Sequence, residues 1–326
     1  MNRRIERQRI RTDAWCLAVS LALVGCGQAA QTAPPPARTS WMAPAKKALD
    51  LLYVSDPTTG LVYAFSYPGG QLQGTISGII GPVGLCSDKS GDVFVSNFGA
   101  SDILEYAHGG TSPISTLVDS GYFPEGCSVD PNSGDLAVTN YCQGSGNQCI
   151  GSGNIAVYQN ASGSPAYYSG PIRDLYYCSY DDRGNLFVDG QSDPVGVPEL
   201  GELKRGASSY ETITVDRHLY WPGGIQWDGK YVALGDSEAG GKSTSSVHLV
   251  RIAGRKGTVV QTMRLAGSGA IEEFTIFGSK LIGPDAKIPA DSSDVRIWNY
   301  PTGGQPTKVI TDDFLSPAGT TISVGR

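Results

Sequence analysis

Six short apolar segments of this chain each end in a residue with a carboxylate or amide side chain. These residues are Asp56, Asn97, Asn140, Asp189, Asp236 and Asp285, and successive ones are 41 to 49 residues apart. Carboxylate and amide oxygens suit Ca²⁺, which takes about six to eight oxygen ligands. If a repeated fold brings the six segment ends to one face, their side chains would hold Ca²⁺ or another divalent cation. A bound cation would polarise a lactone carbonyl and activate water.

A structural role is the alternative for the same six residues. Asp and Asn often end strands because their side chains accept hydrogen bonds from the first turn of the following loop. We expect this turn role for most of the six residues and a ligand role for a subset of them.

The elements that carry these residues form a repeat. In its clearest copy, strands are predicted over residues 83–88, 92–97, 102–107 and 113–119, with a hairpin turn that opens with Asp and closes with Gly between the first two. A period of this length is typical of a β-propeller. The sequence therefore predicts an all-β fold over residues 49–326, namely a six-bladed β-propeller with four antiparallel strands in each blade.

The two ends of the repeat are predicted to complete the last blade together. Residues 317–324 read as an innermost strand with its Pro-x-Gly start, and the sequence then ends. Leu51 begins a second strand that has no innermost strand before it. Pairing the C-terminal strand with the N-terminal strands would remove the open sheet edges that favour aggregation.

Over residues from about 50 to 326 the repeat resembles NHL-type and related six-bladed propellers, and most of all bacterial propeller lipoproteins with no assigned activity. Gluconolactonase-type enzymes and streptogramin B lyases share this architecture. Their catalytic residues find no match in this sequence, so the resemblance implies a fold and not a chemistry. It also implies that the loop after each second strand and the loop before each first strand emerge on one face.

Other polar residues lie near the predicted starts of innermost strands on that face. Glu125, Glu272 and Glu273 would approach the central channel from two strands, and His218 and Trp221 precede another. The candidate face for a ligand or a metal ion therefore consists of Glu125, Asn140, Asp189, Asp236, Glu272, Asp285, His218 and Trp221.

The loops after the second strands differ in length. The loop over 97–102 is short, whereas the loops over 141–154, 190–199, 237–246 and 286–294 are long. Binding sites are commonly built from such loops on a rigid scaffold. We therefore expect a small molecule, a glycan or a protein to bind on this face. Neutral variation in loop length is the alternative.

Five cysteines follow the first 26 residues: Cys86, Cys127, Cys142, Cys149 and Cys178. We expect a disulfide between Cys142 and Cys149, which flank a flexible loop. Cys127 and Cys178 occupy equivalent places in neighbouring repeats, and a bridge between them would need Cα atoms within about 7 Å. The pairing of Cys86, Cys127 and Cys178 is left open, with Cys86 as the candidate for a free thiol.

The first 48 residues are predicted to be a targeting signal followed by a tether. A segment with five Arg precedes an apolar stretch over 14–24, which is too short to span a bilayer as a helix. Leu23-Val24-Gly25-Cys26 resembles the lipobox of bacterial lipoproteins, which implies a signal peptide over 1–25 and lipidation of Cys26; an ordinary secretory signal is the alternative. Residues 26–48 would form a flexible tether rich in Pro and Ala. We expect export and lipid anchoring to the cell envelope, and Gly27 favours the outer membrane.

Composition and missing motifs exclude several functions. The net charge is −6 and no basic stripe occurs, so nucleic acid is not an expected partner. His-Glu-x-x-His and Gly-x-Ser-x-Gly are both absent. We expect a monomeric, membrane-tethered binding protein without catalytic activity. The alternative is a metal-dependent hydrolase or lactonase that uses acids drawn from Glu125, Asn140, Asp189, Asp236 and Glu272.

Overall fold

A computed structural model describes residues 48–192, 196–241, 244–286 and 293–326. The predicted signal peptide, Cys26 and residues 26–47 of the predicted tether lie outside these ranges. Two short 3₁₀ helices, η1 (Gln159–Ala161) and η2 (Ala239–Gly241), are the only helices in the described part of the chain. None of the described helices has the length and apolar character that crossing a membrane requires.

The described strands form four sheets of four strands and one sheet of eight. The first sheet has the order β24 (Thr320–Ser323), β1 (Leu51–Asp56), β2 (Leu61–Ser66) and β3 (Leu72–Ile76). The second contains β4 (Pro82–Ser87), β5 (Val93–Asn97), β6 (Asp102–Tyr106) and β7 (Pro113–Val118). The third contains β8 (Tyr122–Val129), β9 (Leu136–Ser145), β10 (Gln148–Tyr158) and β11 (Ala166–Tyr168). Another contains β20 (Thr275–Phe277), β21 (Lys280–Asp285), β22 (Asp294–Asn299) and β23 (Lys308–Ile310).

The eight-stranded sheet consists of two antiparallel runs joined at their outer strands. One run is β12 (Asp174–Tyr180), β13 (Leu186–Ser192), β14 (Val197–Leu203) and β15 (Glu211–Val215). The other is β16 (Pro222–Trp227), β17 (Val232–Asp236), β18 (Ser245–Ala253) and β19 (Lys256–Leu265). The junction is a parallel pairing of β15 with β19 through Thr214–Lys256 and Val215–Gly257.

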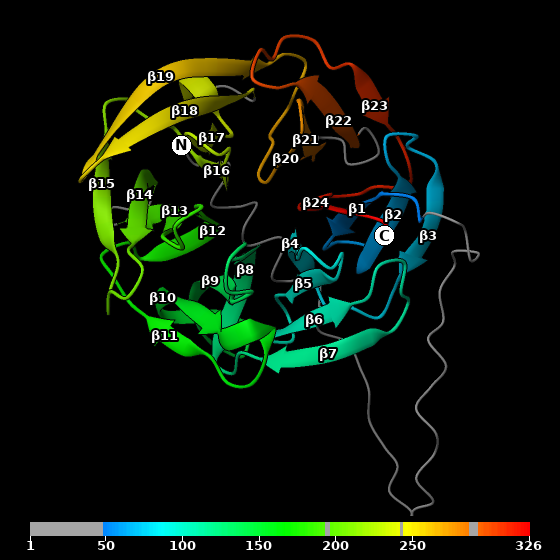
Figure 1. Cartoon of the computed structure of the whole chain (residues 1–326), viewed down its shortest axis with the longest axis horizontal. Helices are drawn as coiled ribbons and strands as arrows, with labels where there is room; N and C mark the ends of the chain where they lie inside the picture. Colours follow the sequence, from blue (N-terminus) through cyan, green and yellow to red (C-terminus); the bar gives the residue numbers. More distant parts are fainter. Residues whose placement is uncertain (1–47, 193–195, 242–243, 287–292) are drawn as a thin grey trace, which may run out of the picture. The chain divides into compact units, whose positions relative to one another are not determined.

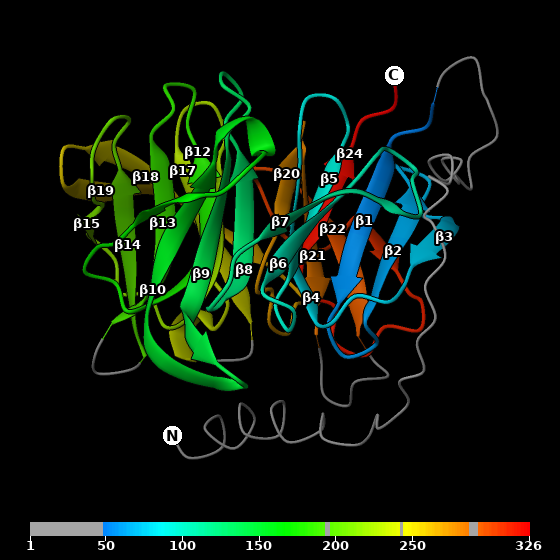
Figure 2. The ribbon, with the colours of Figure 1, turned by 90° about the horizontal axis from the view of Figure 1, so that it is seen from below.

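The sheets of the described domain stand around a common centre, and β4, β8, β12, β16, β20 and β24 are the strands nearest to it (Figure 1). We call these the inner strands. Each strand runs from one face of the domain to the other (Figure 2). We call the lower side of Figure 2 the loop face, because β1, β5, β9, β13, β17 and β21 end there. The opposite side, which Figure 1 views, is the turn face and carries the hairpins that follow the inner strands.

The predicted closure of the domain is confirmed. β24 pairs with β1 from Leu51–Ser323 to Val54–Thr320, so strands from both ends of the chain share one sheet. The four strands predicted for the clearest repeat also agree with β4 to β7 to within one residue at each end. The first long loop is different from the prediction, because β9 and β10 continue through it as a hairpin that extends beyond the neighbouring strands (Figure 2).

The apolar core lies between adjacent sheets. Every residue of β1 is buried, although a strand with one wet face would alternate buried and exposed residues. Tyr53 and Val62 of one sheet pack with Leu85 and Val93 of the next in a single cluster. Each sheet therefore buries both of its faces, which explains the nearly continuous apolar runs in the second strands.

One register position links each inner strand to the next around the ring. Its occupants are Cys86, Ser128, Ser179, Gln226, Thr275 and Thr321, which pair with Phe94, Ala137, Phe187, Ala233, Ile282 and Tyr53. Ser128 Oγ accepts a hydrogen bond from the backbone N–H of Tyr180, and Ser179 Oγ accepts one from that of Trp227, at 3.1 and 2.8 Å. The side chain at this position faces the following sheet.

The disulfides follow from the same register. Cys142 and Cys149 are bonded, as predicted. Cys86 is bonded to Cys127, with their Cα atoms 5.7 Å apart, and Cys178 is the free, buried thiol. The prediction that Cys86 is free is therefore wrong. Cys127 lies one register position before the linking one, so it faces the preceding sheet and meets Cys86.

Candidate ligand-binding site

Most of the strand-end residues hold the connection that leads into the inner strand of their own sheet. Asp56 Oδ2 accepts hydrogen bonds from the backbone N–H groups of Leu315 and Ser316, at 2.7 and 3.0 Å. Asn97 does the same for Ile80. Asp236 accepts from Tyr220 and Trp221, and Asp285 from Gly269 and Ala270. These side chains are buried structural acceptors. Asp56 also holds the following turn through Thr58 and Thr59, and Asp236 does so through the backbone of Glu238.

Asp189 does not belong to this set, because the strand pairing places it one position earlier. Phe187 occupies the position of Phe94, so Gly190 stands where Asn97 stands and Asp189 stands where Ser96 stands. The other residues at the position of Asp189 are Ser55, Ser96, Thr139, Gly235 and Pro284. Asp189 is thus the one carboxylate at a buried position that other repeats fill with small or hydroxyl side chains, and Tyr177 N–H donates to its Oδ1 at 2.8 Å.

A second departure from the repeat occurs at the starts of the inner strands. Four of these strands carry glycine at one position, namely Gly84, Gly126, Gly224 and Gly319. A Cβ atom on Gly126 would lie 2.8 Å from the Cα of Tyr177, so glycine allows adjacent inner strands to approach closely. The remaining two strands carry Tyr177 and Glu273 at this position. The Glu273 side chain projects toward the next inner strand, where Gly319 leaves room for it.

These departures meet near the centre of the domain. We define the axial cluster as Glu125, Tyr176, Tyr177, Asp189, Glu272 and Glu273. Burial first, and then the charges of Glu272, Glu125, Glu273 and Asp189, raise the pKa of Tyr177 well above its ordinary value. Burial also raises the pKa of Glu273 well above its ordinary value. Hydrogen bonds from the backbone of Leu85 and Thr320 oppose the shift, and the charges of Glu125 and Asp189 add to it. The cluster therefore concentrates carboxylates in a poorly hydrated place.

Two carboxylate oxygens of the axial cluster have no hydrogen-bond partner in the described structure. They are Oε2 of Glu273 and Oδ2 of Asp189, whose residues are 7% and 2% exposed. An unpaired buried carboxylate oxygen is costly, because the water it loses on burial is not replaced by a donor. Burial raises the pKa of Asp189 well above its ordinary value, although the Tyr177 amide opposes the shift.

A line of aromatic side chains leads to the cluster across the loop face. We call Phe123, Phe98, Tyr141 and Tyr176 the aromatic track. Phe123 stacks on Phe98 at 4.8 Å between ring centroids, Phe98 lies 6.4 Å from Tyr141, and Tyr141 lies 5.3 Å from Tyr176. Phe98, Tyr141 and Tyr176 are half-buried, so part of each ring faces solvent. Tyr177 continues the line into the interior, 6.1 Å from Tyr176.

The structure places the remaining predicted residues away from the axial cluster. Asn140 Nδ2 donates to Asn154 Oδ1 at 2.8 Å within the β9–β10 pair. Asp285 Oδ2 lies 3.4 Å from Arg296 Nε. His218 is exposed before β16, with its ring 4.7 Å from that of Tyr220, and the nearby Trp221 is half-buried. Of the eight predicted residues, Glu125, Asp189 and Glu272 are brought together.

Metal coordination receives no support from the side-chain geometry. Nowhere in the described ranges do three His, Cys, Asp or Glu side chains converge in a way that would hold a metal ion. The candidate residues fail to form a ring because four strand-end side chains turn toward backbone amides. The acids of the axial cluster instead act together on the electrostatics of Tyr177.

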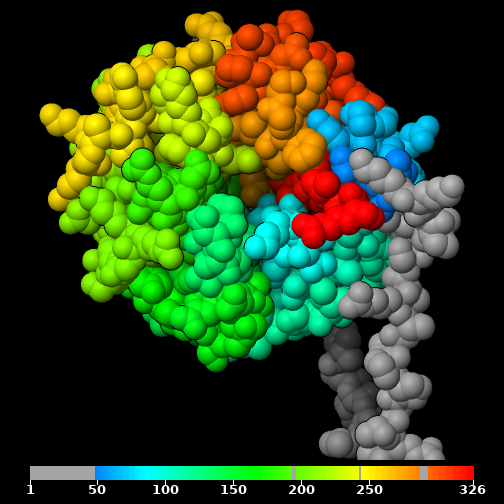
Figure 3. Space-filling view, in the orientation of Figure 1, coloured from blue at the N-terminus to red at the C-terminus, as the bar shows by residue number. Residues whose placement is uncertain are grey.

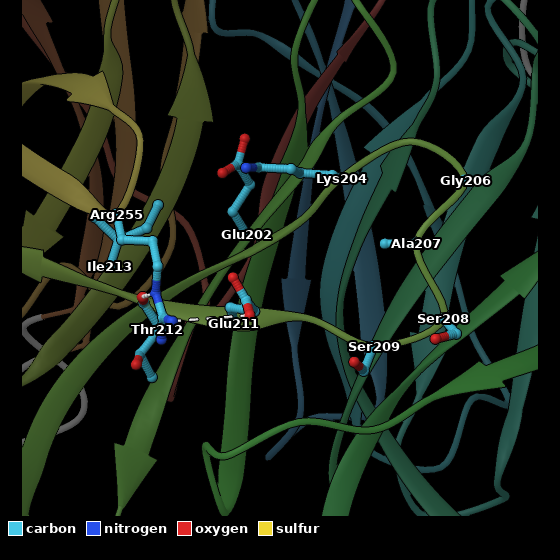
Figure 4. Close-up of a pocket in the computed structure, with 10 residues that line it drawn as sticks. All are labelled: Glu202, Lys204, Gly206, Ala207, Ser208, Ser209, Glu211, Thr212, Ile213 and Arg255. Atoms are coloured by element: carbon cyan, nitrogen blue, oxygen red, sulfur yellow. Dashed lines mark hydrogen bonds and ion pairs between the residues drawn. The ribbon is translucent and has the colours of Figure 1, made fainter.

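A groove also lies on the outer rim of the domain. It measures about 400 Å³ and lies between the β14–β15 turn and the β18–β19 turn, with Glu202, Lys204, Glu211 and Arg255 among its lining residues (Figure 4). Its ion pair between Arg255 and Glu211, at 3.7 Å, is exposed on both sides. Exposed pairs of this kind contribute little to affinity or stability. The groove has no buried polar group that would select a ligand.

Comparison with protein-family models and with curated proteins gave no match. Solved structures do match. One is a chain in a crystal structure of a nidogen/laminin complex, a propeller of the YWTD/NHL type, with a TM-score of 0.65 at 14% identity over 84% of this chain and 98% of that chain. The fold is a β-propeller. Another match is a protein of unknown function from Bacteroides caccae, with a TM-score of 0.62 at 10% identity over 85% of this chain and 99% of that chain. At these identities the likeness concerns the fold alone.

Sequence reasoning missed Tyr176 and Tyr177 and placed Asp189 in the wrong set. The signal for the tyrosines was the missing Pro-x-Gly at the start of β12, where Leu175-Tyr176-Tyr177 stands instead. Ile271-Glu272-Glu273 replaces the same motif before β20. The candidate site is therefore marked by the repeats that depart from the common pattern.

Proposed function

We propose that this propeller is an exported, lipid-anchored binding protein that holds a small ligand at the centre of its loop face, without catalysing a reaction. The observation that carries the proposal is the axial cluster: buried carboxylates with unpaired oxygens at the end of a partly exposed aromatic track. Such polar groups in an otherwise apolar surrounding are typical of ligand sites. Export and anchoring rest on the predicted signal peptide over 1–25 and on Cys26.

The architecture that we propose for this site has six blades of four strands. The runs β12–β15 and β16–β19 would be two blades whose outer edges touch through two residue pairs. The linking position described above supports this count, because it occurs once on each of the inner strands. The protein would act as a monomer, with a small molecule, a glycan or a protein segment as its partner on the loop face.

A metal-dependent hydrolase or lactonase is the other function that the sequence suggested. It would need a divalent ion held by several acids, and the described side chains do not favour this arrangement. Thermal unfolding with Ca²⁺, Zn²⁺ or EDTA, together with a lactone hydrolysis assay, tests the alternative. Turnover that is lost in Asp189→Asn and in EDTA would establish the hydrolase and contradict the binding proposal.

The binding proposal is tested with a ligand library and two matched variants. Tyr176→Ala removes the ring that joins the aromatic track to the axial cluster. Tyr167→Ala removes an exposed ring from the outer strand β11, far from the centre. Ligands that raise the unfolding temperature of the native protein should lose most of this effect in Tyr176→Ala and keep it in Tyr167→Ala. Equal binding by both variants would place the ligand site elsewhere.

A further inference from the structure

We propose that the axial cluster binds the ammonium group of a small organic amine, an inference that rests on the proposed function and names its ligand class. The ammonium group would donate to the unpaired oxygens of Glu273 and Asp189, with the Tyr176 ring beside it, and the charges of Glu125 and Glu272 would add to its attraction. The rest of the amine would lie along the aromatic track.

The charged groups at the centre favour a cationic ligand. The charged groups that act on Tyr177 are Glu272, Glu125, Glu273 and Asp189, and all of them are acidic. None of the described inner strands contains Lys, Arg or His. Arg173 immediately precedes β12, but its Nε lies 3.8 Å from Asp174 Oδ1. The ionisable groups at the described centre are therefore acidic, and a cationic ligand would compensate the charge that they carry when ionised.

Two unpaired carboxylate oxygens favour a ligand that donates hydrogen bonds. Oε2 of Glu273 is directed toward the adjacent inner strand β24, where it would collide with a Cβ atom on Gly319. Oδ2 of Asp189 is the other buried acceptor without a donor. An ammonium group carries only hydrogen-bond donors and a positive charge, so it supplies what both oxygens lack. A neutral sugar would bring hydroxyl donors, but it would leave the carboxylate charges uncompensated.

The aromatic surface next to these acids favours an organic cation. Tyr176 and Tyr141 are half-buried and form an edge-to-face pair, with their ring centroids 5.3 Å apart and their rings at 74°. Organic cations bind favourably over the faces of aromatic rings within about 6 Å of the centroid. A metal ion gains much less from such rings. The combination of aromatic faces and carboxylates therefore selects an organic ammonium group over an inorganic cation.

The space-filling view shows a hollow at the middle of the turn face, bordered by segments of several sheets; this face lies opposite the loop face that carries the candidate site (Figure 3). Around the axis, adjacent inner strands approach closely at Gly84, Gly126 and Gly319, where an added Cβ atom would collide with neighbouring atoms. Only two of the six inner strands carry a large side chain at this position, namely Tyr177 and Glu273.

The test uses the purified full-length chain and two pairs of probes. Putrescine and butylamine supply primary ammonium groups, and butane-1,4-diol and butan-1-ol are their neutral analogues. Isothermal titration calorimetry at pH 8 should show at least one amine binding at least tenfold more tightly than its analogue. Glu272→Gln should weaken that binding about tenfold or more, because it removes one of the attracting charges. Glu211→Gln, on the outer strand β15, is the control and should bind normally.

The pH dependence gives a readout that a purely structural role would not produce. Because Glu273 and Asp189 must be ionised to hold the cation, binding should weaken as the pH falls from 8 to 5.5. The groups that face them are Glu125, Glu272, Tyr177 and Cys178, none of which gains positive charge in this range. Glu273→Gln should flatten the dependence. Amines that bind no more tightly than their analogues, or equally well to Glu272→Gln, would overturn the ammonium inference. The proposed function would survive that result if a neutral ligand lost its binding in Tyr176→Ala.

Discussion

Ser128 of β8 and Cys178 of β12 face each other in the same way as the bonded Cys86 and Cys127. Ser128 occupies the register position of Cys86, and Cys178 occupies that of Cys127. Cys178 Sγ lies 3.8 Å from the carbonyl oxygen of Ala137, the residue that pairs with Ser128. The next pair of inner strands is therefore built for a disulfide and lacks one of the two sulfur atoms.

Ser128→Cys should form a disulfide with Cys178 under oxidising conditions. The Cα separation should match the 5.7 Å found for Cys86–Cys127, within the range that a disulfide allows. Mass spectrometry of an unreduced digest should detect the linked peptides, and the free energy of unfolding should rise by about 2 kcal/mol. Ser179→Cys is the matched control, because it faces β16 and has no cysteine opposite. A linked Cys178 in the control, or a free one in Ser128→Cys, would contradict this register.

Glu273→Gln should stabilise the protein at pH 8 and not at pH 4. Burial raises the folded-state pKa of Glu273, so its contribution to stability is present below the unfolded-state pKa and is lost as the pH rises through the folded-state pKa. A neutral side chain of the same shape avoids this loss, so the free energy of unfolding should rise by about 1–3 kcal/mol at pH 8. Urea unfolding at both pH values measures the difference. Asp189→Asn should behave in the same way, and an exposed change such as Glu211→Gln should have little effect. A Glu273→Gln variant that is less stable than the native protein at pH 8 would show that hydrogen bonds compensate the charge of the native carboxylate.

His248 should make the protein less stable in mild acid. Burial first, and then the charge of Arg217, lower the pKa of His248 to about 4. The unfolded chain binds this proton near pH 6.5, so stability is retained above that value and lost as the pH falls toward 4. The loss should reach about 2–3 kcal/mol at pH 4. His248→Gln should remove this loss of stability in thermal unfolding scans between pH 7 and 4, whereas a change at the exposed His218 should not. Equal acid sensitivity in the two variants would show that His248 is not its source.

Gly126→Ala should destabilise the domain and displace the candidate site. The added Cβ would lie 2.7 Å from the carbonyl oxygen of Tyr176 and 2.8 Å from the Cα of Tyr177, and backbone atoms cannot move aside locally. We expect a loss of about 1–3 kcal/mol in unfolding free energy, accompanied by weaker ligand binding. Gly151→Ala is the control, because its nearest contact is the flexible end of the Gln143 side chain. Comparable losses in the two variants would mean that close strand approach is not the role of Gly126.

The fold was largely predictable from the sequence, because each repeat carries its own apolar pattern and turn residues. β4 to β7 and the pairing of β24 with β1 are local patterns or direct consequences of the repeat. The disulfide of Cys86 depends on a different property. Which face a strand residue occupies changes with every single position, so an error of one position in register exchanges neighbours.

The candidate site was predictable only in part for the same reason. Asp189 looks like a strand end, but Gly190 holds that position and carries no side chain to reveal it. Tyr177 and Glu273 stand where a glycine is missing, and a missing motif does not indicate what its replacement contacts. Glu125 and Glu272 were found because they keep a recognisable place beside the inner strands.

The pairing of β24 with β1 also orders events during synthesis. Gly319 donates its backbone N–H to Ser55 Oγ at 2.9 Å across a separation of 264 residues. On the ribosome, β1, β2 and β3 are made first, yet the edge of β1 stays bare until translation reaches residue 320. The earliest sheet is then the last to be completed, so the nascent chain carries an unpaired strand through nearly all of its elongation.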